Sequence, residues 1–163
     1  MTGDGGTEVR NGLEACLPRL WRYAFVLTRT AQDAEDLTQA TCLRAIERAH
    51  QFAPGTRLDR WLFAILRSIW LNQVRAERLR QGEGQIDAEA ALWFDGAHAI
   101  ETNMMAAQVL KKLGAMPTAQ RETALLVYAE GYSYAEAAAT LGIPVGTVMS
   151  RLAAVRAALT RVE

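Results

Sequence analysis

Residues 132–152 constrain the fold more than any other part of the chain. Ser133, followed three residues later by Glu136, has the pattern of a capping box and predicts the start of a short helix. Gly142 can supply the turn conformation that ends this helix. Apolar residues then recur at spacings of four, three and four, at Val148, Leu152, Val155 and Leu159. Such a repeat predicts a second helix with a single buried face, and cap, turn and repeat together predict a helix-turn-helix.

Helical periodicity also fills most of the remaining chain. Thr30 and Asp33 have the pattern of a helix cap, and Pro54-Gly55 is a turn signal that precedes another helical pattern. We expect helices over residues 13–28, 31–50, 57–80, 101–113, 118–130, 134–141 and 145–161. No segment shows convincing two-residue alternation, so the predicted fold class is all-α, without strands.

The segment 81–100 separates two groups of predicted helices. It contains three glycines and scattered acids, with an apolar island at residues 92–94. The formal net charge of the chain is zero, but residues 56–80 carry six Arg against two acids, and residues 81–110 carry five acids and no Lys or Arg. Residues 111–163 are again slightly basic. We therefore predict two small helical domains, 8–80 and 101–163, joined by an acidic linker over 81–100.

Several classes of protein are disfavoured by composition. No apolar run approaches the ~20 residues of a membrane span, and the expected location is the cytoplasm. Cys16 and Cys42 have no metal-like spacing and are expected to be small buried thiols, so neither a metal nor a cofactor is expected. No nucleophile motif, His–carboxylate cluster or phosphate loop appears, which argues against an enzyme.

Arginines form a stripe along the helix predicted over residues 57–80. At ~100° per residue they fall within an arc of about 80°, and they are Arg57, Arg60, Arg67, Arg75 and Arg78. Phe63 and Trp70 border this stripe. Arginines neutralise phosphates and aromatic rings can stack on unpaired bases, so the combination favours opened or single-stranded DNA. The alternative is a solvated basic face whose aromatic neighbours belong to the core.

The second helix of the predicted helix-turn-helix presents few side chains that can read DNA. Small residues dominate its outward face, and hydrogen-bonding groups come only from Thr147, Ser150, Arg151 and Arg156. Direct readout of bases should therefore be limited, with more weight on DNA shape and phosphates. The alternative is an ordinary helical hairpin that packs on another protein.

Three stretches in this order resemble the extracytoplasmic-function (ECF) sigma factors, the smallest members of the sigma-70 class. The stretches are residues 33–39 (Asp-Ala-Glu-Asp-Leu-Thr-Gln), residues 55–72, and residues 116–122 followed by the helix-turn-helix. The resemblance covers about residues 13–80 and 107–161. The chain departs from the family at Ala40, where an acid is usual, and at Met149 and Ala154, where relatives are often basic.

The resemblance implies a role for each stretch. Core RNA polymerase would dock on Asp33, Glu35, Asp36, Leu37 and Gln39. The opened −10 element would lie along Arg57, Arg60, Phe63, Arg67, Ser68, Trp70, Asn72, Arg75 and Arg78. The −35 element would meet Thr147, Met149, Ser150, Arg151 and Arg156. Family members commonly also bind an anti-sigma factor.

Two other functions remain open from the sequence. The first is a stand-alone helix-turn-helix regulator that binds duplex DNA, which would leave residues 31–80 without a purpose. The second is a decoy that titrates an anti-sigma factor without binding DNA, which the loss of basic character near Met149 slightly favours and the arginine stripe disfavours.

Overall fold

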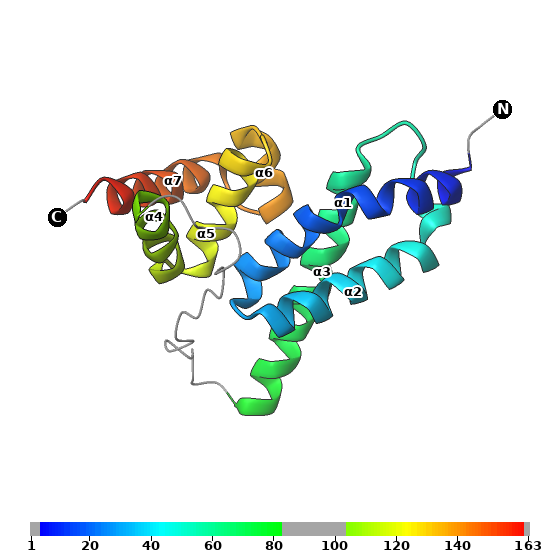
Figure 1. Ribbon diagram of the computed structural model, residues 1–163, viewed down its shortest axis with the longest axis horizontal. Coiled ribbons are helices and arrows are strands. Elements are labelled where there is room, and N and C mark those ends of the chain that lie inside the picture. Colours follow the sequence, from blue (N-terminus) through cyan, green and yellow to red (C-terminus); the bar gives the residue numbers. More distant parts are fainter. Residues whose placement is uncertain (1–3, 83–103, 162–163) are drawn as a thin grey trace. The chain divides into compact units, whose positions relative to one another are not determined.

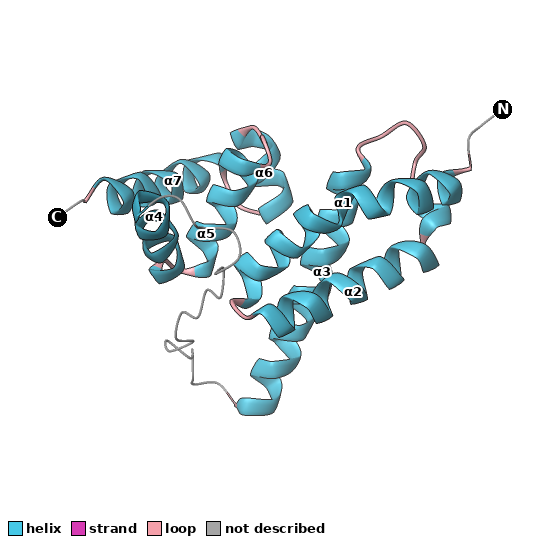
Figure 2. Cartoon of the chain, in the orientation of Figure 1, coloured by secondary structure: helices cyan, strands magenta, loops and turns pink. Residues whose placement is uncertain are grey.

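The structure is a computed structural model that describes residues 4–82 and 104–161. Helices joined by turns make up these residues, and no strand occurs among them (Figure 1, Figure 2). The all-α prediction is therefore confirmed. The chain divides into two compact units, Met1–Ala90 and Ala91–Glu163, which we call unit 1 and unit 2 and describe separately.

Unit 1 is a three-helix unit. It contains α1 (Gly5–Thr28), α2 (Ala31–Glu47), a single 3₁₀ turn η1 (Ala49–Gln51) and α3 (Leu58–Gln81). Each of the three long helices packs on the other two, and Figure 1 shows α1 beside α2. The largest fully buried side chains of this core include Leu20, Tyr23, Leu37, Leu62, Phe63 and Leu66.

Helix α1 begins eight residues before the start predicted from periodicity. The Asp4 carboxylate accepts a hydrogen bond from the Gly6 N–H at 3.1 Å and so caps the helix. Gly5 lies so close to η1 that a Cβ atom there would stand 2.6 Å from the carbonyl oxygen of Phe52. Glycine residues weaken a helix in isolation, so this turn forms because the cap and the close packing compensate for their low propensity.

Unit 2 contains the predicted helix-turn-helix. Its elements are α4 (Met104–Ala115), α5 (Thr118–Ala124), a π-helical turn η2 (Leu125–Ala129), α6 (Tyr134–Leu141) and α7 (Val145–Thr160). The Ser133 hydroxyl accepts the Glu136 N–H at 3.0 Å, and Gly142 ends α6 in the left-handed region at φ 65°. Val148, Leu152 and Val155 are fully buried, as the four-three repeat predicts.

The helix expected over residues 118–130 is not one regular α-helix. It changes at Leu125 into the π-helical turn η2, which closes when the Glu130 N–H donates to the carbonyl oxygen of Leu125 at 3.0 Å. A π turn contains one more residue than an α turn, so it shifts the faces on which later side chains lie. Periodicity in a short window does not reveal such a turn.

Arg121 stabilises the turn between α4 and α5 through hydrogen bonds to backbone carbonyl groups. Its side chain is buried, and Nη1 donates to the carbonyl oxygen of Met116 at 2.9 Å. The carbonyl groups at the end of a helix lack partners within the helix, and a buried guanidinium satisfies them here. Arg121 belongs to the 116–122 stretch that carries the family resemblance, and its contacts in unit 2 are structural.

Some predictions fall on residues that the structure does not describe. Most of the acidic linker, including the apolar island at residues 92–94, lies outside the described ranges. Within those ranges, no single helix is long and apolar enough to cross a membrane. Helices α6 and α7 meet the length and composition criterion only as a pair, and they are bent by 105° at the break between them.

Candidate functional site

The arginine stripe lies on the face of α3 that points away from the core of unit 1. Arg75 and Arg78 are exposed near the end of the helix, and Arg67 is half-buried. Ser68 and Asn72 are exposed on the border of this face. The buried face is centred on Leu66, about 140° around the helix from the middle of the stripe. The described part of α3 therefore presents a basic, hydrogen-bonding surface to solvent.

Phe63 does not belong to that surface, which corrects the sequence prediction. Its side chain is 0% exposed and packs edge-to-face on Tyr23, with ring centroids 5.3 Å apart. A ring enclosed on all sides cannot stack on a base. Trp70 is half-buried and so remains partly exposed, while Trp61 is half-buried and contacts Phe52 at a centroid distance of 5.2 Å.

Two arginines meet at Asp59 in the first turn of α3. Arg57 donates from Nε and Nη2 to the two carboxylate oxygens at 3.1 and 2.8 Å, and Arg19 of α1 donates to Oδ2 at 2.9 Å. The Arg19 guanidinium also lies 5.3 Å from the centre of the Phe63 ring. Arg57 thus has a partner inside the protein. Arg19 could not be predicted as that network's second arginine, because no local pattern links residues 40 positions apart.

The bidentate hydrogen bond from Arg57, together with the one from Arg19, holds the pKa of the Asp59 carboxyl well below its usual range. A folded-state pKa below the unfolded value of ~3.9 means that the network stabilises the fold above that pH and loses this contribution as pH falls through the folded pKa. At pH 7, Asp59→Asn should lower the free energy of unfolding by about 1.5 kcal/mol, the low end for hydrogen bonds to charged groups, because Arg57 is largely exposed.

Urea unfolding of wild type and Asp59→Asn at several pH values tests this network. The difference between the two proteins should shrink as pH falls below ~4. A difference that stays constant down to the lowest accessible pH would show that the Asp59 charge does not stabilise unit 1.

The acidic end of α2 forms a second candidate surface. The Thr30 hydroxyl accepts the Asp33 N–H at 3.1 Å and starts the helix, and Asp33, Glu35, Asp36 and Gln39 are exposed. Leu37, also predicted as a polymerase contact, is only 1% exposed and belongs to the core, because its position on α2 faces α1 and α3. Its prediction as a direct contact is therefore corrected.

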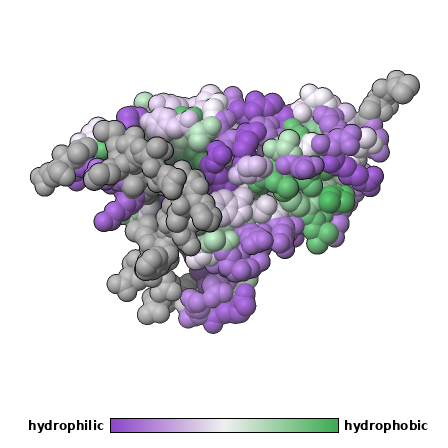
Figure 3. All heavy atoms as spheres, in the orientation of Figure 1, coloured by the Kyte–Doolittle hydropathy of each residue, from purple (hydrophilic) through white to green (hydrophobic). Residues whose placement is uncertain are grey.

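Two apolar side chains that the sequence analysis did not select extend this surface. Leu43 is 60% exposed and Ile46 is 44% exposed. Leu43 lies four residues after Gln39 on α2, and Ile46 lies three residues after Leu43, so all three share one face of the helix. Hydrophobic surface gathers over the C-terminal end of α2 in Figure 3. The helical spacing from Gln39 is the sequence signal from which Leu43 and Ile46 could have been predicted.

Helix α7 presents its predicted contacts unevenly. Met149 and Ser150 are exposed, and Thr147 and Arg151 are half-buried. The Ser150 hydroxyl donates to the Thr147 carbonyl oxygen at 3.1 Å within the helix. Arg156 is exposed, and its Nη1 donates to the hydroxyl of Tyr128 at 2.9 Å.

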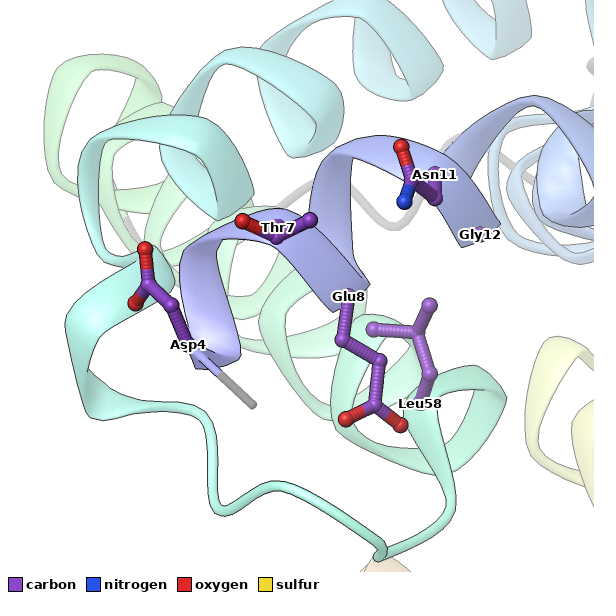
Figure 4. A pocket seen from close by; sticks show the side chains of 6 residues that line it. All are labelled: Asp4, Thr7, Glu8, Asn11, Gly12 and Leu58. Carbon is purple, nitrogen blue, oxygen red and sulfur yellow. The ribbon is translucent and has the colours of Figure 1, made fainter. Parts of the chain in front are cut away.

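A shallow pocket lies between the start of α1 and the start of α3 (Figure 4). It is lined by Asp4, Thr7, Glu8, Asn11, Gly12 and Leu58. The Glu8 carboxylate accepts the Gly55 N–H at 3.3 Å, which fastens the loop before α3 to α1. The carboxylates of Asp4 and Glu8 in this pocket repel phosphate, so the pocket does not extend the basic surface of α3.

The cysteines show no sign of a reactive site. Cys16 and Cys42 are half-buried and are not joined in a disulfide, and burial raises the pKa of the Cys42 thiol. Cys42 is therefore protonated at neutral pH. Among the described residues, no group of three His, Cys, Asp or Glu could hold a metal ion.

Comparison with known proteins agrees with the geometry. The family model for Sigma-70 region 2 matches residues 13–80, and the model for Sigma-70 region 4 matches residues 106–159. The ECF RNA polymerase sigma factor EcfG of Rhodopseudomonas palustris is 35% identical over 94% of this chain and 83% of its own length. The ECF sigma factor SigC of Mycobacterium tuberculosis is also 35% identical, over 94% and 82%.

Solved structures give the same result. The sigma factor RpoE of Bartonella quintana, crystallised with the anti-sigma factor NepR, is 30% identical with a TM-score of 0.75 over 93% of this chain and 94% of that one. CnrH, solved with the cytosolic domain of CnrY, is 24% identical with a TM-score of 0.59 over 96% and 90%, and supports the fold alone. With both family models matched and a relative 35% identical over 83% of its length, the chain belongs to the ECF sigma factors of the sigma-70 family.

Proposed function

We propose that this alternative sigma factor divides promoter recognition between its two units, with unit 1 docking on core RNA polymerase and holding the opened −10 strand, and unit 2 reading the −35 element. The chain itself performs no chemistry in this proposal, because polymerase forms the phosphodiester bonds. Its place of action is the cytoplasm, where polymerase meets the chromosome.

The observation that carries the proposal is that unit 1 has two exposed surfaces of opposite charge. The exposed acids of α2 suit a basic docking surface on polymerase, while the exposed arginines of α3 suit a DNA backbone. Ser68 and Asn72 border the arginines and offer hydrogen bonds to a base that has left the stack. A regulator that binds only duplex DNA has no need of the acidic docking surface.

We extend the docking surface to Leu43 and Ile46. Large exposed apolar side chains beside polar ones are typical of a surface that a partner covers. An anti-sigma factor is the second partner that we propose for this surface, since the RpoE relative was solved in complex with one. A partner that covers α2 would block polymerase docking directly.

Run-off transcription from a randomised promoter library tests the proposed function. Core polymerase reconstituted with the chain should select templates that share two sequence elements, whereas core polymerase alone should select none. Failure to bind core polymerase would leave the stand-alone regulator as the explanation. Polymerase binding without promoter selection would instead favour the decoy.

A further inference from the structure

Two tyrosines and one arginine meet on the surface of unit 2. Arg156 on α7 donates from Nη1 to the hydroxyl oxygen of Tyr128 in η2, at 2.9 Å. Tyr134 is the first residue of α6 and also lies near Arg156, and the hydrogen bond to Tyr128, with a smaller contribution from Tyr134, raises the pKa of the guanidinium. We call these three residues the Tyr–Arg cluster.

The π-helical turn is what brings Tyr128 into the cluster. Tyr128 lies inside η2 and is 53% exposed, while Leu125 and Leu126 in the same turn are buried. Single π turns inside helices are rare and frequently occur at functional sites. The turn thus places a large aromatic residue at the surface, against Arg156, where the core gains little from it.

The hydrogen-bond directions leave the cluster with unused donors. A guanidinium only donates, so each tyrosine oxygen that it contacts must accept, and each tyrosine O–H proton is left to point elsewhere. Among the described residues, neither hydroxyl donates to a protein acceptor. The guanidinium has five N–H donors, so Arg156 held by a tyrosine oxygen keeps further donors and its positive charge for an oxygen anion.

Arg156 does not point into the groove that α7 would enter. It lies about 120° around the helix from Ser150 and only about 40° from the buried Leu152. A side chain at that edge is placed toward the sugar–phosphate backbone and not toward base edges. In a docked helix-turn-helix, the first helix crosses the DNA backbone, and Tyr134 begins that helix.

The geometry points to the Tyr–Arg cluster as a binding site for one backbone phosphate at the edge of the major groove. Tyr128 acts in it as a positioning residue that holds the Arg156 guanidinium. This inference rests on the proposed −35 recognition by unit 2 and gives Arg156, expected only to meet the −35 element, a specific role as a phosphate contact that is independent of sequence.

Holoenzyme binding to promoter DNA across a salt series tests the inference. The probes are a promoter selected from the library and the same duplex with its −35 element scrambled. Arg156→Ala should weaken both about tenfold at 0.1 M salt and reduce the slope of log affinity against log salt by about 0.9. Introduced alone, Tyr128→Phe should weaken binding to both duplexes about threefold to tenfold. Added to Arg156→Ala, it should weaken binding less than twofold further.

The controls separate this site from general effects of charge and folding. Lys111→Ala removes one exposed charge from α4 in the same unit and should leave the slope nearly unchanged. All three cluster residues are exposed, so thermal unfolding should be unaffected.

Three outcomes would overturn the inference. An unchanged salt slope for Arg156→Ala excludes a phosphate contact, and a loss confined to the selected promoter makes Arg156 a base reader. An undiminished Tyr128→Phe effect in the double variant shows that Tyr128 does not act through Arg156. Equal wild-type binding to both duplexes would instead contradict the proposed −35 recognition, which these variants do not test.

Discussion

Replacing both Arg75 and Arg78 with alanine is expected to reduce promoter-dependent transcription by roughly 10- to 50-fold while leaving affinity for core polymerase unchanged. Both side chains are exposed on the outward face of α3, about 60° apart around the helix. Each is expected to neutralise one phosphate of the opened strand, which contributes ~0.7 to the salt slope per contact on a single strand. The slope should therefore fall by about 1.4.

Arg80→Ala is the matched control for this prediction. Arg80 lies on the same helix end but about 140° around from Arg75, and its guanidinium is 3.8 Å from the Glu77 carboxylate. Arg75→Ala alone and Arg80→Ala each remove one charge, and only the first should lower transcription and the salt slope. Equal losses from the two variants would mean that total charge, and not the arginine face, determines binding. Reduced polymerase affinity would assign these arginines to docking.

Phe63→Ala is expected to lower the free energy of unfolding of unit 1 by about 3–5 kcal/mol, the usual range for removing a buried aromatic side chain. The ring is enclosed between Tyr23 and Arg19, so its loss leaves a cavity and also removes an edge-to-face contact. Urea unfolding followed by circular dichroism measures the change. A loss smaller than ~1 kcal/mol would contradict the placement of Phe63 in the core.

Phe63→Leu separates a core role from a role in base stacking. Leucine keeps most of the buried volume, so the variant should remain folded at 25 °C. Promoter opening, measured by permanganate reactivity of unpaired thymines, should then stay within about twofold of wild type. Trp70→Leu, which removes a partly exposed ring, is expected to reduce opening by fivefold or more, since stacking contributes about 1–3 kcal/mol per base. Loss of opening in Phe63→Leu at full stability would return Phe63 to the DNA surface.

The helix-turn-helix shows which features can be predicted from a short window of sequence. The predicted bounds of α6 agree with the structure, and those of α7 differ by one residue at the C-terminal end. The Ser133 cap and the Gly142 turn act within four residues of themselves, so a short window of sequence contains everything that determines them. The glycine-rich start of α1 was not predicted, because the Asp4 cap is offset by the low helix propensity of glycine and the turn also needs packing against Phe52, far along the chain.

The candidate sites show which features local sequence does not predict. The arginine stripe and the acidic end of α2 were predictable because residues on one helix face recur at a known spacing. The burial of Phe63 and Leu37 was not, because both lie at the edge of an amphipathic face, where the neighbouring helices decide what they cover. The sequence alone could not separate a ring that borders the DNA surface from one that fills the core.

By itself, the sequence determined the approximate helix positions, the Thr30 and Ser133 caps, the division into basic and acidic segments and the family, since each depends on residues close together along the chain or on a linear pattern. Only the tertiary structure decided which side chains are available for binding. The contact between Arg19 and Asp59 spans 40 residues and that between Tyr128 and Arg156 spans 28. Such pairs form only when helices pack, and the π-helical turn that exposes Tyr128 has no local signal that marks it in advance.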